Sequence, residues 1–190
     1  MGTNVCFECT KCGACCSEEG LIVTLTGSDI VRLSVFLGLS ASEILRAIDF
    51  YVLPQGEETP DGLRRIPYVN TERGKTYLAL RKMDGKSCVF LSDNLCLIHQ
   101  IRPGVCVSFP FVFEDRGEET TWGLNAMKDI CPGLNDGPQV ELSTIEKISS
   151  TVLEDLALYR AFADEWNTTQ EDPTALSLIE TILSDHRFLI

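Results

Sequence analysis

Cysteine spacing is the feature of this chain with the clearest chemistry. Five of its nine cysteines fall in the run C-F-E-C-T-K-C-G-A-C-C, at Cys6, Cys9, Cys12, Cys15 and Cys16, and the other four lie downstream at Cys88, Cys96, Cys106 and Cys131. Successive C-x2-C steps that end in an adjacent pair can direct several thiolates into one small volume. Zinc and iron–sulfur centres require such an arrangement of soft ligands. The spacing therefore predicts metal ions held by sulfur.

Eight of these cysteines match the ligand count of two four-sulfur sites. Cys9 and Cys12 can grip one tetrahedral ion through a tight turn, and Gly13 permits the positive φ that such turns often need. Cys15 and Cys16 are adjacent, so their side chains diverge, and we expect them to serve two centres or two metals of one cluster. The predicted ligands are Cys9, Cys12, Cys15, Cys16, Cys88, Cys96, Cys106 and Cys131.

The sequence leaves the metal and the ninth cysteine open. Zinc and an iron–sulfur cluster would use the same thiolates, although the repeated C-x2-C spacing and a Cys-Pro such as Cys131-Pro132 are also found in ferredoxins. Redox-active thiols and disulfides are the alternatives to metal. Cys6 is a spare thiol or a replacement ligand, and the spare is favoured because eight cysteines already complete two sites.

Composition and charge restrict the class of partner. The 28 acidic residues outnumber the 16 basic ones, for a net charge of -12, which disfavours nucleic acid and favours a basic protein partner. No segment has the about 18 apolar residues of a membrane span, and the first residues lack the regions of a signal peptide. We expect a cytoplasmic protein with reduced thiols.

Apolar periodicity predicts an α+β fold, with a small antiparallel sheet, helices, a cysteine-rich N-terminal arm and a C-terminal helical pair. Strands are expected over 21–25, 88–91, 109–113 and 120–124, with a hairpin over 65–70 and 76–81. Helices are expected over 30–37, 39–52, 143–166 and 173–183. An N-cap is expected within 26–28 for the first, and Ser40 and Glu43 have capping-box spacing at the start of the second. Pro138 marks a boundary between a metal-binding domain, 1–137, and a helical extension packed on it, 138–190.

Several spaced motifs resemble the CxxCxxCC cysteine-cluster family of zinc- or iron-chelating proteins. They are C-T-K-C-G-A-C-C over 9–16, T-x2-D-I-x-R-L over 26–33, C-V-F-L over 88–91, C-x-I-H-x2-R-P-x2-C over 96–106 and F-P-F over 109–111. The resemblance covers roughly residues 7–134 and implies metal chelation. Relatives include a flagellin lysine-N-methylase, which makes a methyltransferase relevant. Cys6 lies outside the shared pattern, and the position of His99 is more often a tyrosine in the family.

No hydrolytic or nucleotide-binding motif accompanies the cysteines. Asp29 and Arg32 are interpreted as a surface ion pair, and Lys11, Lys86 and Arg102 as bases near the ligands or ordinary surface bases. Three functions fit: a protein that stores or transfers metal or electrons, an iron–sulfur-dependent protein methyltransferase, and an interaction module structured by zinc. The first is favoured.

Overall fold

The chain, a computed structural model that describes residues 2–54, 56–115, 117 and 120–189, combines helices with small antiparallel sheets. The helices are α1 (Ala14–Ser17), α2 (Gly27–Leu37), α3 (Ala41–Ile44), α4 (Gly104–Ser108), α5 (Leu142–Thr169) and α6 (Ala175–Ser184). The strands are β1 (Gly2–Phe7), β2 (Ile48–Val52), β3 (Val69–Thr71), β4 (Gly74–Leu80), β5 (Lys82–Met83), β6 (Ser87–Cys88), β7 (Leu91–Ser92), β8 (Leu95–Cys96), β9 (Phe111–Asp115), β10 (Thr120–Leu124) and β11 (Leu134–Glu141). The predicted α+β class, with its C-terminal helical pair, is confirmed.

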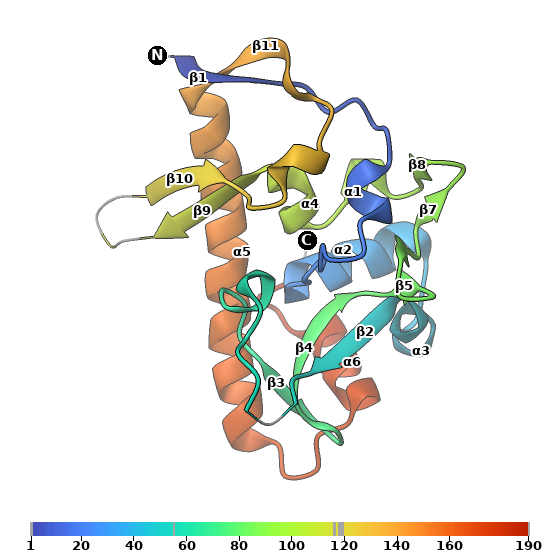
Figure 1. Cartoon of the computed structure of the whole chain (residues 1–190). Coiled ribbons are helices and arrows are strands. Elements are labelled where there is room, and N and C mark those ends of the chain that lie inside the picture. Colours follow the sequence, from blue (N-terminus) through green and yellow to red (C-terminus); the bar gives the residue numbers. More distant parts are fainter. Residues whose placement is uncertain (1, 55, 116, 118–119, 190) are drawn as a thin grey trace.

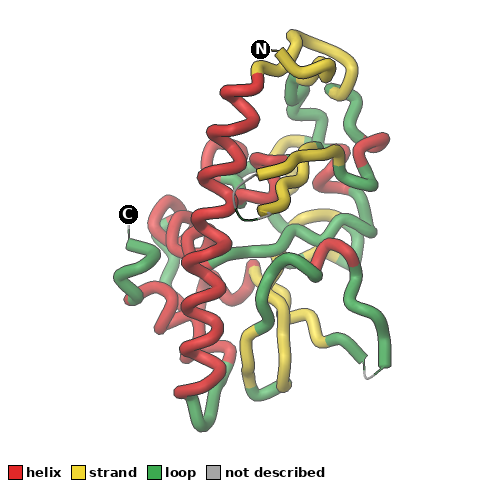
Figure 2. The backbone as a smooth tube through the Cα atoms, turned by 90° about the vertical axis from the view of Figure 1, so that its left-hand side faces the viewer, coloured by secondary structure: helices red, strands yellow, loops and turns green. Residues whose placement is uncertain are grey.

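Helix α5 runs along most of the height of the molecule, and the other elements pack beside it (Figures 1 and 2). The pairs β1–β11 and β9–β10 lie near its first residues, while the three-stranded sheet β2–β4–β3 lies toward its end (Figure 1). Single 3-10 turns at Leu45–Ala47, Asp61–Leu63, His99–Ile101 and Lys128–Ile130 connect several of these elements. No helix among the described residues is long and apolar enough to cross a membrane.

The main core lies between the three-stranded sheet, α2, α5 and α6. Leu25, Ile30, Leu78, Tyr159 and Leu178 are each 0% exposed in it. A second, smaller core joins Phe111 and Phe113 of β9 to Val140 and to Ile145 of α5. Because α5 contributes to both cores, it links the sheet-and-helix body to the strands that carry the N-terminal arm.

Local capping signals correctly predict where α2 and α3 begin. Thr26 caps α2 in a capping box with Asp29, and Gly38 ends the helix in a left-handed conformation with φ 65°. Ser40 and Glu43 form the expected capping box at the start of α3. Both boxes satisfy backbone donors within four residues, so tertiary contacts are not needed to position these helix starts.

Three expected segments differ in the structure. The helix expected over 39–52 is wrong beyond residue 47, because Ile48–Val52 pairs with β4 as strand β2. The segment I-D-F-Y-V is β-branched and aromatic, and pairing with a strand far along the chain overrides its helical spacing. The expected strand 21–25 is reduced to a bridge at Thr24, and 88–91 contributes to two hairpins, β5–β6 and β7–β8.

The N-terminal strand is held by the segment that precedes α5. β1 pairs antiparallel with β11, with Cys6 opposite Gln139 and Phe7 opposite Leu134. Pro138, the predicted boundary residue, lies inside β11, so the division into 1–137 and 138–190 falls within a paired strand. The cysteine arm leaves this strand pair at Glu8, whose backbone N–H donates to Gly133 at 3.2 Å.

Candidate metal centre

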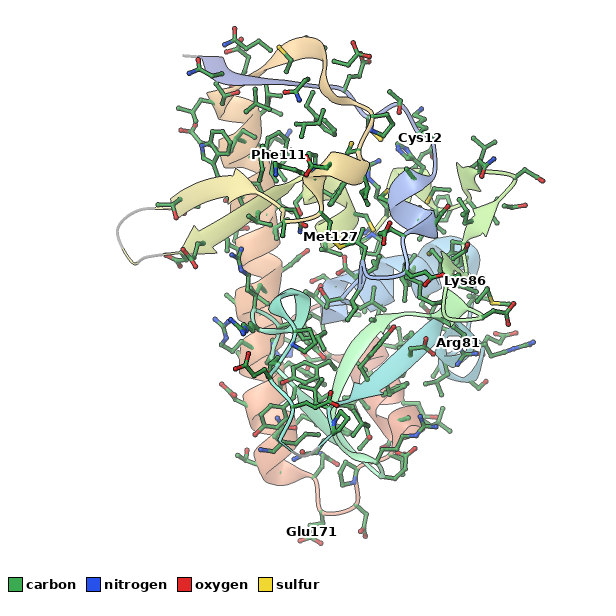
Figure 3. All side chains as sticks on the ribbon, in the orientation of Figure 1. Cys12, Arg81, Lys86, Phe111, Met127 and Glu171 are labelled. Atoms are coloured by element: carbon green, nitrogen blue, oxygen red, sulfur yellow. The ribbon has the colours of Figure 1, made fainter. Side chains whose placement is uncertain are left out.

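The cysteines of the arm meet those of the middle of the chain in one region of the fold. α1 carries Cys15 and Cys16 and packs against β6, which carries Cys88. Cys96 ends β8 and Cys106 lies in α4, and Figure 1 shows the ribbons of α4 and β8 on either side of α1. Figure 3 shows Cys12 on the loop that enters α1. The arm and the body thus supply sulfurs to the same volume.

Gly13 fixes the arm in this position. It precedes α1 with a φ of 74°, a conformation that costs other residues free energy. A Cβ on Gly13 would lie 2.7 Å from the backbone oxygen of Asn94, between β7 and β8. The carbonyl of Gly13 accepts the backbone N–H of Cys16 at 2.9 Å. One residue therefore turns the chain, starts α1 and allows the arm to approach the β7–β8 hairpin closely.

Three cysteines interact at the centre of the site. The Cys16 thiol, which has one proton, interacts with the sulfurs of Cys15 and Cys96. These interactions lower the pKa of Cys15 to about 7 and that of Cys96 to about 6, and the positive charge of Arg102 lowers both further. The pKa of Cys16 is raised because it retains the proton that the three sulfurs share. Near neutral pH the group holds thiolates together with a thiol.

Three further cysteines lie close enough to Cys15 for its negative charge to affect their pKa values. Burial raises the pKa values of Cys88, Cys106 and Cys131, and the charge of Cys15 raises each of them further. Burial and like charge both disfavour additional thiolates here. A bound metal cation would favour the thiolate form instead, because its positive charge offsets the negative charges of the sulfurs that it coordinates. The donor set, all sulfur and gathered around Cys15, fits zinc or iron.

Asp29 connects helix α2 to the loop that presents Cys106. It is 2% exposed, and its Oδ1 accepts from Arg32 Nη2 at 2.5 Å and from the backbone N–H of Gly104 at 2.9 Å. Its Oδ2 accepts from the backbone N–H of Thr26 at 3.0 Å. Gly104 begins α4, two residues before Cys106. The interpretation of Asp29 and Arg32 as a surface pair is therefore wrong, because the carboxylate is buried and positions a ligand loop.

Arg102 and His99 border the site on the side of the arm. The Arg102 guanidinium donates to the carbonyl of His99 at 3.0 Å and to the carbonyl of Cys106 at 3.3 Å. Cys9 Sγ lies 3.8 Å from His99 Nε2. Burial and the charges of Arg102 and Lys11 lower the pKa of His99. The histidine is therefore neutral at pH 7 and faces an exposed thiol of the arm.

The remaining predicted residues are placed as follows. Cys12 is exposed, and Cys6 lies in β1 opposite Gln139. Lys86 is exposed in the β5–β6 turn. Lys82 donates to the carbonyl of Glu18 at 2.5 Å, and its charge partly opposes the rise that burial causes in the pKa of Cys88. The sequence carried no signal for Lys82, because its role depends on the pairing of β5 with β6.

All nine cysteines are free thiols. In the part of the chain that the structure describes, no three cysteine, histidine or acidic side chains already stand at the mutual distances of ligands to one ion. A bound metal would replace the protons of the thiols that it coordinates.

A family model with the description "CxxCxxCC: putative zinc- or iron-chelating domain" matches residues 8–132. The match spans all eight predicted ligands, from Cys9 to Cys131, and leaves out Cys6. No curated protein and no solved structure matches the chain.

Proposed function

The chain belongs to the CxxCxxCC family, and we propose that it is a metal-binding protein that holds zinc or an iron–sulfur centre through its clustered cysteine thiolates. The observation that carries this proposal is the packing of α1, which holds Cys15 and Cys16, against β6, which holds Cys88, because it brings the arm to a hairpin far along the chain. The proposed ligands are Cys9, Cys12, Cys15, Cys16, Cys88, Cys96, Cys106 and Cys131.

The protein's own groups prepare this site in two ways. The interaction with the Cys16 thiol lowers the pKa values of Cys15 and Cys96 and so favours their thiolate forms. Fewer protons must then leave when a metal binds. Arg102 places a positive charge near these thiolates, and its guanidinium also ties the His99 turn to the end of α4. A bound metal supplies either a redox couple or a cross-link between the arm and the body.

We further propose a cytoplasmic location and a basic protein partner. The free cysteines suit a reducing compartment, and the net charge of -12 favours a partner of the opposite sign. The favoured biological role is storage or transfer of metal or electrons.

The decisive experiment is the measurement of iron, zinc and acid-labile sulfide per chain on protein purified without oxygen. Cys96→Ser and Cys106→Ser are compared with Cys6→Ser, whose thiol lies in β1 outside the cluster. We expect the first two variants to lose metal and the third to retain it. Iron with matching sulfide indicates a cluster, whereas zinc alone indicates thiolate sites without redox chemistry. Wild-type metal content in both Cys96→Ser and Cys106→Ser would refute the ligand assignment.

A further inference from the structure

Cys9 and His99 are spaced as two ligands of one metal ion. Their Sγ and Nε2 atoms lie 3.8 Å apart, although 90 positions separate the residues. With the usual zinc–sulfur and zinc–nitrogen bond lengths and a tetrahedral angle, two such ligands stand about 3.5 Å apart. A shift of a few tenths of an ångström in one exposed side chain would bring both within coordination distance of the same ion.

The lone pair of His99 Nε2 is not used by its cationic neighbour. Arg102 Nη1 lies 2.9 Å from Nε2 and 3.2 Å from Nδ1 of the same ring. An atom almost equally distant from both ring nitrogens cannot lie in the ring plane without overlapping the carbon between them. The guanidinium therefore covers the face of the ring and leaves the in-plane lone pair of Nε2 available to a metal ion.

The sequence offers a third ligand, and a pocket offers an open position. Cys12 is exposed and follows Cys9 in C-x2-C spacing, which can place two thiolates on one ion. A pocket of about 270 Å³ opens beside His99 and is lined also by Lys11 and Cys96. A fourth ligand could reach an ion at this place from the pocket, as water does in zinc sites with three protein ligands.

We propose that His99 is a metal ligand and that it forms, with Cys9 and Cys12, an outer zinc site with one exchangeable position. This inference rests on the proposed metal-binding function and extends it to a residue outside the cysteine set. A mixed nitrogen and sulfur donor set favours zinc over an iron–sulfur cluster. Each of the two thiols releases its proton to solvent on coordination, and His99 binds in its neutral form. The other six proposed ligands remain grouped around Cys15.

The test uses the full-length protein, metal-free and then titrated with zinc alone, with its histidines labelled with ¹⁵N. The chain has two histidines, so the ring nitrogens of His99 and His186 can be resolved and assigned with one variant each. We expect zinc to shift the Nε2 resonance of His99 and to leave His186 unchanged. His186 is the matched control because its side chain is 91% exposed and neighbours Asp185 rather than a cysteine.

Zinc affinity, measured against a chromophoric chelator, gives a second readout. His99→Ala should lower the affinity for one zinc ion by about 10- to 100-fold or more, because loss of a residue that only supports a metal ligand already has an effect of this size. His186→Ala should match the wild type. If zinc binds but the His99 nitrogens do not move, the inference fails and the proposed function stands. If no zinc binds at all, the inference fails, and the measurement of iron, zinc and sulfide per chain decides the proposed function. Because the chain has two histidines, the His186 variant alone assigns both rings, so misfolding of His99→Ala would not prevent an answer.

Discussion

Replacing Asp29 by asparagine should destabilise the protein and loosen its metal site together. The carboxylate is 2% exposed and accepts hydrogen bonds from Arg32, Gly104 and Thr26. The Asp29→Asn substitution would remove the negative charge and direct an NH₂ group at some of these donors. Removing one partner of a buried ion pair costs about 3–5 kcal/mol. The side chain of Arg32 is 29% exposed, so it can recover hydration and the cost should lie near the lower figure.

A matched variant separates the helix cap from the loop contact. Thr26→Ala removes the capping hydroxyl of α2 but leaves the bonds of Asp29 to Arg32 and Gly104, so it should cost about 1 kcal/mol. In a protein of this size, about 1 kcal/mol corresponds to a change of about 2–4 °C in the melting temperature. We therefore expect Asp29→Asn to melt about 6–12 °C below the wild type, and Thr26→Ala about 2–4 °C below it.

Thermal unfolding and metal retention against a chelator should be measured on the same samples. Asp29→Asn should lose metal faster than Thr26→Ala, because only Asp29 holds the backbone N–H of Gly104 at the start of α4. If both variants lost stability equally and retained metal equally, Asp29 would act as a helix cap alone. The argument that it positions the Cys106 loop would then be refuted.

Three further outcomes are expected. Gly13→Ala should lower the free energy of unfolding by at least about 1–2 kcal/mol because of the positive φ at this position, and by more because the new Cβ overlaps Asn94 O. Urea unfolding measures this change, and an unchanged midpoint would contradict the close approach of the arm. The hydrogen bonds from Arg187 lower the pKa of Asp185, so this carboxylate stabilises the fold above its unfolded pKa of about 3.9 and the contribution is lost as pH falls through the folded value. Asp185→Asn should therefore lower stability at pH 7 and flatten its acid dependence, and parallel curves would refute the pairing. Because α5 and α6 complete the main core, residues 138–190 should unfold with the rest in one calorimetric transition, and two transitions would contradict this expectation.

Local sequence signals predicted the elements whose geometry is fixed within a few residues. The capping boxes at Thr26 and Ser40 and the long apolar stripe of α5 are such signals, and the structure has helices at all three places. Ile48–Val52 was mispredicted because its pairing partner, β4, lies more than twenty residues away. Asp29 was misinterpreted for the same kind of reason, since its burial and its bond to Gly104 depend on a loop far along the chain.

The sequence by itself determined the chemistry of the site, because five cysteines in C-x2-C and adjacent spacing, with four more downstream, indicate soft sulfur ligands whatever the fold. Only the tertiary structure decided which sulfurs meet. Gly13 lets the arm approach Asn94, which brings α1 beside β6 and allows Cys16 to interact with Cys96. The approach of Cys9 to His99 has the same origin. Contacts between distant segments depend on how elements dock, and spacing along the chain does not encode docking.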